Sequence, residues 1–494
     1  MHLVTRVPAI RIHDCNDAPV RGSRYVLYWM IATRRLTFNF ALDRALEHCR
    51  DLRKPLVIFE ALRCGYRWAS DRTHRFALDG MADNAATCHR AGVRYFPYVE
   101  PTAGAGRGLL EALARDACVV VTDDYPCFFL PRMVAAAAKK LPVRMEAVDS
   151  NGILPMRAAG RVFSTAHSFR RFLQKTLPAH LTEFPTASPF DRLDIADVAA
   201  IANTISKRWR AADSRSFFGT SGSLEKLPID HGVEPTPIRG GEAAARKRMK
   251  EFITQGLGDY GKKRNEPEMD VTSGLSPYLH FGHISAHEIF RKVVQQEKWR
   301  PEKLSVRADG RRSGWWNMSA NAESFLDELI TWREVGYNFS SQTKLYDRYE
   351  SLPPWALKTL KRHARDERQH VYALKEFESA KTYDPLWNAS QTQLVREGRI
   401  HNYLRMLWGK KILEWSRSPK EALDVMIHLN NKYGLDGRDP NSYSGIFWCL
   451  GRYDRPWGPE RPVYGQVRYM SSENTARKFS VKNYLRKYAE VKQT

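Results

Sequence analysis

Two sequence patterns divide this chain, and they constrain its fold more than any other feature. Between Tyr25 and Asp149, short apolar runs rich in β-branched and aromatic residues alternate with longer stretches of helical periodicity. The runs are YVLYWM (25–30), PLVIFE (55–60), VRYFPYV (93–99), ACVVVTDD (117–124) and VRMEAVD (143–149). Strands that alternate with helices form a parallel sheet covered on both faces. We therefore predict an α/β domain with a five-stranded, Rossmann-like parallel sheet, although no GxGxxG motif follows its first strand.

The second half of the chain follows the other pattern. From Glu242 onward strand signals almost vanish, and long amphipathic helices succeed one another. Gly and Pro punctuate the stretch before this point, which is typical of a connector. We predict an N-terminal extension (1–22), an α/β domain (23–165), an interdomain connector (166–241) and an all-helical domain (242–494). The basic, Trp-containing segment 298–321 within the helical domain is expected to be an exposed loop.

The net charge of the chain indicates which kind of partner it binds. The 494 residues include 78 Lys and Arg against 55 Asp and Glu, a formal net charge of +23. Such an excess favours a polyanionic partner such as nucleic acid, because each neutralised phosphate releases counterions. A basic surface that only maintains solubility is the alternative. The 7 scattered cysteines form no CxxC pair, which argues against disulfides or a metal site and favours a reducing compartment. No apolar run suits a membrane span or a secretory signal.

The segment TSGLSPYLHFGHIS (272–285) has small hydroxyl residues ahead of a helical run. They are Thr272, Ser273 and Ser276. Hydroxyls and free backbone N–H groups at a helix start can hold a phosphate. A helix cap without a ligand uses the same residue types, so both interpretations stay open.

The segment FLDELITWREV (325–335) combines a carboxylate with an aromatic side chain. Glu328 and Trp332 are four residues apart and share one helical face, and Arg333 follows. A carboxyl group buried beside an aromatic ring can stay protonated and donate a hydrogen bond. An exposed glutamate on an ordinary amphipathic helix is the alternative.

The segment WNASQTQLVREGRIHNYLRMLWGKKILEW (387–415) is rich in tryptophan. Arg405, Trp408 and Trp415 are spaced so that they share one helix face, and Trp387 precedes them. Indoles at such spacing can relay an electron. A tryptophan stripe packed into a core has the same pattern.

The segment LNNKYGLDGRDPNSYSGIFW (429–448) contains the turn sequence DGRDPN. Its Asp436 can pair with a cation such as Arg405, although a plain structured loop is the alternative. Trp448, Trp457 and Arg468 follow along the chain. Aromatic and cationic groups together suit a surface that meets nucleic acid.

In this order, the motifs resemble the photolyase/cryptochrome family, and most closely its class II cyclobutane pyrimidine dimer photolyases. The resemblance rests on LSPYLHFG, DPLWNASQ, WGKKILEW, DGRDPN and VRYM, and it covers the chain from about Tyr25 to Phe479. It implies an α/β antenna domain and a helical domain that binds FAD. It further implies light-driven electron-transfer splitting of dimers flipped out of UV-damaged duplex DNA. A deazaflavin or folate antenna chromophore often accompanies FAD in this family.

The resemblance also assigns roles by position. On the diphosphate and adenine side, FAD would contact Tyr260, Arg264, Thr272, Ser273, Leu275, Ser276 and Leu279. Around the ribityl chain and isoalloxazine it would contact Arg333, Asn402, Arg405, Asn430, Asp436 and Asp439, with Asn430 near flavin N5 and Arg405 paired to Asp436. The dimer pocket would comprise Glu328, Trp332, Asn402, Met406 and Trp448. Trp408, Trp387 and Trp415 would relay electrons outward, and Trp457 and Arg468 would fill the hole left by the flipped dimer.

The main rival hypothesis is a cryptochrome-like blue-light photoreceptor that binds FAD without repairing DNA. The retained pocket residues, from Glu328 to Trp448, favour repair. The helix sequences GRIHNYLRM and ITWREVGYNF depart from the usual class II wording and resemble class I. We expect a monomer in the cytoplasm or nucleoid, or in the nucleus of a eukaryote.

Overall fold

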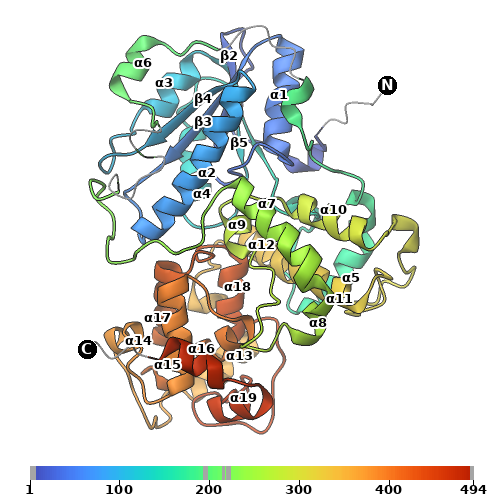
Figure 1. Ribbon diagram of the computed structural model, residues 1–494, viewed down its shortest axis with the longest axis vertical. Helices are drawn as coiled ribbons and strands as arrows, with labels where there is room; N and C mark the ends of the chain where they lie inside the picture. Colours follow the sequence, from blue (N-terminus) through green and yellow to red (C-terminus); the bar gives the residue numbers. More distant parts are fainter. Residues whose placement is uncertain (1–6, 193–198, 214–216, 218–223, 490–494) are drawn as a thin grey trace. The chain divides into compact units, whose positions relative to one another are not determined.

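The computed structural model describes residues 7–192, 199–213, 217 and 224–489. The chain divides into two compact units, which are both drawn in Figure 1. Unit 1 consists of Met1–Ala158, Leu177–Met249 and Leu275–Lys292, and unit 2 consists of Ala159–Thr176, Lys250–Gly274 and Val293–Thr494. The segment 166–241, predicted as a connector, contributes helix α5 (Ala166–Thr176) to unit 2 and its remainder to unit 1.

Unit 1 is built on a six-stranded sheet in the order β1-β6-β5-β2-β3-β4. The five predicted strands are present and parallel: β2 (Tyr25–Met30), β3 (Leu56–Leu62), β4 (Arg94–Val99), β5 (Ala117–Asp123) and β6 (Met145–Val148). The predicted count of five is nevertheless one too low. Strand β1 (Ile12–Asp14), in the predicted N-terminal extension, pairs antiparallel with β6 and places Ile12 opposite Val148. Because β1 has only 3 residues and exposes two of them, it has no apolar pattern that a sequence could show.

Helices pack against the sheet, and this explains why its strands are buried. Every residue of β2 is buried. Helix α1 packs in one cluster with Val26 and Tyr28 of β2, and α2 packs in another with Leu62 and Val99. The helices of unit 1 are α1 (Phe40–Leu52), α2 (Asp71–Arg90), α3 (Leu109–Arg115), α4 (Leu130–Ala138), α6 (Asn203–Arg208), α7 (Glu242–Glu251, ending in unit 2), α9 (Ser276–His280) and α10 (Ala286–Gln296, also ending in unit 2), with short turns η1 (Ala9–Arg11), η2 (Met156–Ala158), η3 (Leu177–His180) and η4 (Pro189–Arg192).

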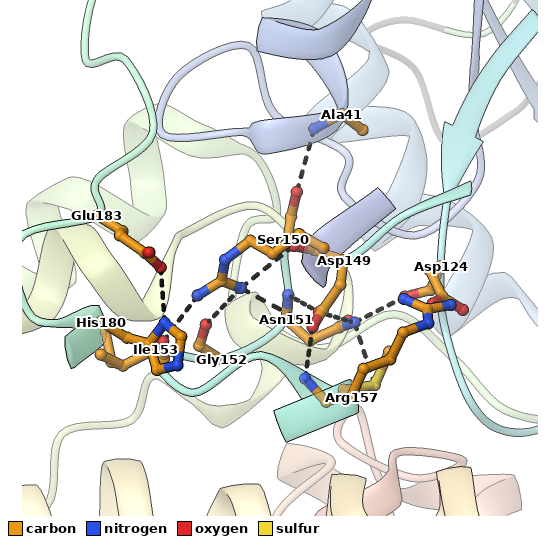
Figure 2. A network of polar contacts seen from close by, with 12 residues as sticks. Ala41, Asp124, Asp149, Ser150, Asn151, Gly152, Ile153, Arg157, His180 and Glu183 are labelled. Carbon is orange, nitrogen blue, oxygen red and sulfur yellow. Dashed lines mark hydrogen bonds and ion pairs between the residues drawn. The ribbon is translucent and has the colours of Figure 1, made fainter. Parts of the chain in front are cut away.

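Polar contacts fix the loop that follows β6 (Figure 2). Asp149 accepts hydrogen bonds from Asn151 Nδ2 at 2.8 Å and from the backbone N–H of Met156 at 2.7 Å. Asn151 Nδ2 also donates to the carbonyl oxygen of Asp124 at 2.7 Å, and Arg157 donates to the Asp124 carboxylate at 2.6 Å. The chain leaving β6 is thereby tied to the residue that follows β5.

Within the described residues, the named elements of unit 2 are all helices, joined by loops, which confirms the helical character predicted for the second half of the chain. Its elements are α5, η6 (Phe252–Gly256), η7 (Leu257–Asp259), α8 (Tyr260–Lys263), η8 (Pro301–Lys303), α11 (Ala320–Leu326), η9 (Asp327–Trp332), α12 (Arg333–Gln342), η10 (Tyr349–Ser351), α13 (Pro354–Arg362), α14 (Leu374–Glu378), α15 (Pro385–Glu397), α16 (Asn402–Trp415), α17 (Pro419–Tyr433), α18 (Pro440–Cys449), α19 (Ser472–Lys478) and α20 (Lys482–Tyr488). Side chains cap some of these helices at their N-termini; Asp384 and Ser418, for example, accept hydrogen bonds from the first turns of α15 and α17.

The expectation of an exposed loop at 298–321 is wrong for its tryptophans. Trp299, Trp315 and Trp316 are buried, whereas the basic side chains between them are exposed. Across the described ranges, no helix has the length and apolarity needed to cross a membrane. The same ranges hold no cluster of His, Cys, Asp and Glu suited to a metal ion, and no disulfide joins the cysteines there.

Candidate active site

The residues predicted to form the dimer pocket come from η9, α16 and α18 of unit 2. The indoles of Trp332 and Trp448 stack, with ring centroids 4.7 Å apart and planes inclined by 24°. Glu328 lies on η9 as well, and η9 is a π-helical segment, a feature that is frequent at functional sites. Because the stacked pair leaves no space between its rings, a further flat ring can stack only on an outer face of the pair.

Glu328 forms an ion pair with Arg264. Although 29% of the Glu328 side chain is exposed, burial raises the pKa of its carboxyl group, and the positive charge of Arg264 offsets that rise only in part. The Arg264 guanidinium also lies over the ring of Tyr260, 5.6 Å from its centroid. Sequence comparison assigned Arg264 to the cofactor and Glu328 to the dimer, and the structure joins the two side chains directly. A carboxyl group with a raised pKa keeps its proton to higher pH and can then donate a hydrogen bond.

Of the predicted phosphate-binding hydroxyl residues, Thr272 and Ser273 lie between α8 and α9, and Ser276 is the first residue of α9. Thr272 and Ser273 are half-buried residues of unit 2, and Thr272 Oγ1 is 3.5 Å from Asp270 Oδ1. Leu275, Ser276 and Leu279 belong to unit 1, where Leu275 is buried and Ser276 is exposed. Helix α9 has only 5 residues, so its dipole contributes little to phosphate binding. The hydroxyl groups are the main phosphate-binding groups that this segment provides.

The predicted ion pair between Arg405 and Asp436 is confirmed. Arg405 Nη2 lies 3.0 Å and 3.2 Å from the two Asp436 carboxylate oxygens. A second polar link joins Arg333 to Asp439: Arg333 Nη2 donates to the Tyr337 hydroxyl at 3.0 Å, and this hydroxyl donates to Asp439 Oδ2 at 3.4 Å. Sequence reasoning missed Tyr337. Its position four residues after Arg333 on α12 is the signal that could have indicated it.

The remaining residues predicted for the cofactor site and the dimer pocket differ in exposure. Asn430 is buried on α17, and its Nδ2 donates to Ser442 Oγ at 2.6 Å. Asn402 is exposed at the first position of α16. Met406 is half-buried one turn later, with its Sδ 4.0 Å from the Cys449 Sγ. The amide nitrogen of Asn430 is thus committed to a partner within the protein.

The three predicted relay tryptophans are all buried and form one chain of contacts. Trp408 Nε1 donates to Gln391 Oε1 at 2.9 Å. Trp387 Nε1 donates to the backbone carbonyl of Trp408 at 3.0 Å. The rings of Trp387 and Trp415 meet edge to face with centroids 5.8 Å apart. The contacts therefore run in the order Trp408, Trp387, Trp415.

Other side chains complete this aromatic cluster, and sequence reasoning missed them. The Tyr383 ring is 49% exposed and lies 5.5 Å from the Trp415 ring, centroid to centroid. The Lys411 ammonium lies 5.3 Å from the centroid of the same indole. Gln391 could have been found from its place one helical turn after Trp387 on α15, whereas Tyr383 precedes that helix and carries no such signal.

The two residues predicted to enter the DNA lie together. The Arg468 guanidinium is 5.2 Å from the centroid of the Trp457 ring, which is 37% exposed. Arg455 lies 5.0 Å from the same ring, and Trp457 Nε1 donates to Asp454 Oδ1 at 3.0 Å. The structure thus brings an exposed indole and two guanidinium groups to one place.

Comparison with known proteins identifies the family. No family model matches the sequence. A protein of Methanothermobacter thermautotrophicus named "Deoxyribodipyrimidine photo-lyase" is 34% identical, over 97% of this chain and 98% of the relative. Proteins of the same name from Oryza sativa subsp. japonica and Potorous tridactylus are 35% and 32% identical, over 86% and 81% of their own lengths and 93% and 94% of this chain. A solved class III photolyase from Agrobacterium tumefaciens shares the fold, with a TM-score of 0.69 at 16% identity over 94% of this chain and 86% of that one. The chain therefore belongs to the photolyase/cryptochrome family.

Proposed function

We propose that this protein is a light-driven DNA repair enzyme of the class II type, which uses FAD to split cyclobutane pyrimidine dimers flipped out of duplex DNA. The observation that carries the proposal is that Glu328 shares the short π-helical element η9 with Trp332, whose indole stacks on that of Trp448. Near full-length relatives named as photolyases support it. We further propose that the protein acts as a monomer in the compartment that contains the DNA.

The side chains of unit 2 fit FAD by their chemistry. Arg264 and the hydroxyls of Thr272 and Ser273 are donors suited to a diphosphate. The Arg405–Asp436 pair combines a donor with an acceptor and so suits a flavin ring edge or ribityl hydroxyls. When bound, FAD supplies the light-excited electron donor for the reaction. The dimer takes up one electron, its two cyclobutane carbon–carbon bonds break and the electron returns, so the reaction involves no net oxidation.

The protein's own residues position the dimer. The outer face of the Trp332–Trp448 pair offers a stacking surface for an extruded base. When protonated, Glu328 offers a hydrogen bond to a thymine carbonyl; burial raises the pKa of this carboxyl group, whereas its ion pair with Arg264 favours the ionised form. Extrusion of a base costs a few kcal/mol and is cheapest at a poorly stacked lesion, which itself gives selectivity. Trp457 and Arg468 suit the space that the extruded dimer leaves.

Trp408, Trp387 and Trp415 are proposed to carry electrons inward when the cofactor has become oxidised. Their contacts follow this order, because the Trp387 indole N–H donates to the Trp408 backbone carbonyl and the Trp387 ring meets the Trp415 ring. Burial of all three rings keeps them out of water. This route restores the active state of the cofactor and takes no part in repair itself.

The test is repair under light. Reduced holoprotein is illuminated with an oligonucleotide that contains a single thymine dimer, and restored thymines are measured by chromatography. We expect light-dependent restoration, with none in the dark and less in Glu328→Gln. A parallel oligonucleotide with a (6-4) photoproduct tests lesion preference. Absorption of the purified protein beyond that of FAD would reveal a deazaflavin or folate antenna.

Failure to restore thymines by a protein that holds flavin would refute repair and favour the blue-light photoreceptor. Repair of the (6-4) photoproduct alone would refute the assignment to cyclobutane dimers.

A further inference from the structure

The segment between α10 and α11, residues 298–319, concentrates exposed positive charge. Its basic side chains are all exposed: Lys298, Arg300, Lys303, Arg307, Arg311 and Arg312. Only two acidic residues, Glu302 and Asp309, accompany them. Val306 is fully exposed between the basic positions. We call residues 298–319 the basic segment.

Buried tryptophans hold the basic segment in a defined shape. The Trp316 ring makes edge-to-face contacts with Trp299 and Trp315, at centroid distances of 5.7 Å and 4.7 Å. Trp299 Nε1 donates to the carbonyl of Trp316 at 2.5 Å, and the backbone N–H of Ser305 donates to the carbonyl of Trp315 at 2.9 Å. Asn317 Nδ2 donates to the carbonyl of Lys303 at 2.7 Å. Because these contacts join the two ends of the segment, its cations are presented at little cost in backbone entropy.

The far part of the basic segment is attached to α5. The Gln174 side chain accepts a hydrogen bond from the backbone N–H of Gly310 at 2.7 Å and donates to the carbonyl of Arg311 at 2.9 Å. Asp309 bridges Arg307 and Arg311, with its Oδ2 3.0 Å and 2.7 Å from their nitrogens. This pairing neutralises one of the two arginine charges but orients both guanidinium groups, and it lowers the pKa of Asp309.

The basic segment is also coupled to the element that carries the dimer pocket. Arg170 of α5 binds both carboxylate oxygens of Asp327, the first residue of η9, at 2.7 Å and 3.0 Å. The same guanidinium donates to the carbonyl of Gly310 at 3.4 Å. The charge of Arg312 acts on Glu328, where it lowers the pKa of the carboxyl group against the effect of burial. Arg312 therefore lies within electrostatic reach of the proposed dimer pocket.

We infer that the basic segment is a second DNA-binding surface, which contacts the phosphates of the duplex beside the flipped dimer. This inference rests on the proposed function and extends it from the lesion to the flanking duplex. Exposed cations on a rigid scaffold suit a backbone that is regular and independent of sequence. Because the segment is coupled to η9 through Arg170, phosphate contacts there also set the position of the pocket.

The test compares two variants that lose the same charge. One is Lys298→Ser/Arg300→Ser/Lys303→Ser in the basic segment, which leaves Arg312 in place, and the matched control is Arg90→Ser/Arg132→Ser/Lys139→Ser, three exposed basic residues of unit 1. Affinity for undamaged duplex is measured by fluorescence anisotropy over a range of salt concentrations. The first variant should lose ~10-fold or more in affinity at moderate salt, and its log K against log [salt] should be shallower by up to ~3 units, at ~0.9 per phosphate contact. The control should retain the wild-type slope.

A second substrate tests whether the basic segment contacts the duplex that flanks the lesion or the lesion itself. On a short single strand with the dimer and few flanking phosphates, the basic-segment variant should bind and repair like the wild type. Equal loss in both variants, or no change in the slope, would overturn the inference, because the effect would then come from net charge alone. Equal loss on duplex and short strand would also overturn it. Failure of the proposed function is seen separately, as absence of repair by the wild type.

Discussion

Replacement of Trp408 by phenylalanine separates the proposed relay from repair. A benzene ring is much harder to oxidise than an indole, so Trp408→Phe should slow photoreduction of the oxidised holoprotein at least ~10-fold, equivalent to ~1.4 kcal/mol of barrier or more. Repair by protein reduced chemically beforehand should stay within ~2-fold of the wild type, because no residue of the dimer pocket changes.

The structure also sets the cost in stability. Trp408 is buried, and its Nε1 donates to Gln391 Oε1 at 2.9 Å. Loss of this donor leaves a buried amide oxygen without its partner, which costs ~1–3 kcal/mol. The smaller ring removes about three atoms of buried apolar surface, ~2 kcal/mol more. We therefore expect Trp408→Phe to lower the free energy of unfolding by ~3–5 kcal/mol, within what a folded domain tolerates. Urea unfolding followed by tryptophan fluorescence measures it.

Trp299→Phe is the matched control for this experiment. Trp299 is also buried in unit 2, and its Nε1 also donates to a protein oxygen, the carbonyl of Trp316. It has no place in the contact chain that contains Trp408, so this variant should lose stability but photoreduce at the wild-type rate. If Trp408→Phe and Trp299→Phe slowed photoreduction equally, or if repair by the pre-reduced Trp408→Phe protein fell as far as its photoreduction, Trp408 would be a packing residue and the relay would be refuted.

Two further predictions concern carboxyl groups. Glu328→Gln should lower the yield of repaired dimer per absorbed photon while the flavin absorbance of the purified protein stays unchanged; loss of flavin would place Glu328 in the cofactor site instead. Glu146 lies against Arg44 and His48: burial would raise the pKa of its carboxyl, but the hydrogen bonds from these partners lower it from 4.5 to about 2. A lowered pKa contributes stability that is present above pH ~4.5 and lost as the pH falls toward ~2, up to ~3 kcal/mol here. Glu146→Gln should therefore destabilise the protein by ~2–3 kcal/mol at neutral pH, and the deficit in urea unfolding should shrink below pH ~4; a deficit independent of pH would contradict the assignment.

Local sequence patterns accounted for most of the fold. The five parallel strands and the helical second half were predictable because each buried strand and each amphipathic helix carries its own periodicity. Strand β1 was not, because 3 residues with one half-buried and two exposed side chains carry no period. The division into units could not be predicted from the sequence either, because α5 belongs to unit 2 although it lies far upstream of most of that unit in the chain. Arg170 and Gln174 of α5 make long-range contacts that no local pattern encodes.

The candidate site divides in the same way. The order of the motifs identified the family and the types of residue in the site. The opposite charges of Arg405 and Asp436 predicted their ion pair. Only the tertiary structure decided that Arg264 binds Glu328, and that the Trp332 and Trp448 indoles stack on each other. It also decided that the tryptophans of 298–319 are buried while the arginines are exposed. The physical reason is that side-chain pairing depends on distances between segments far apart in sequence, whereas periodicity records only which face of one segment avoids water.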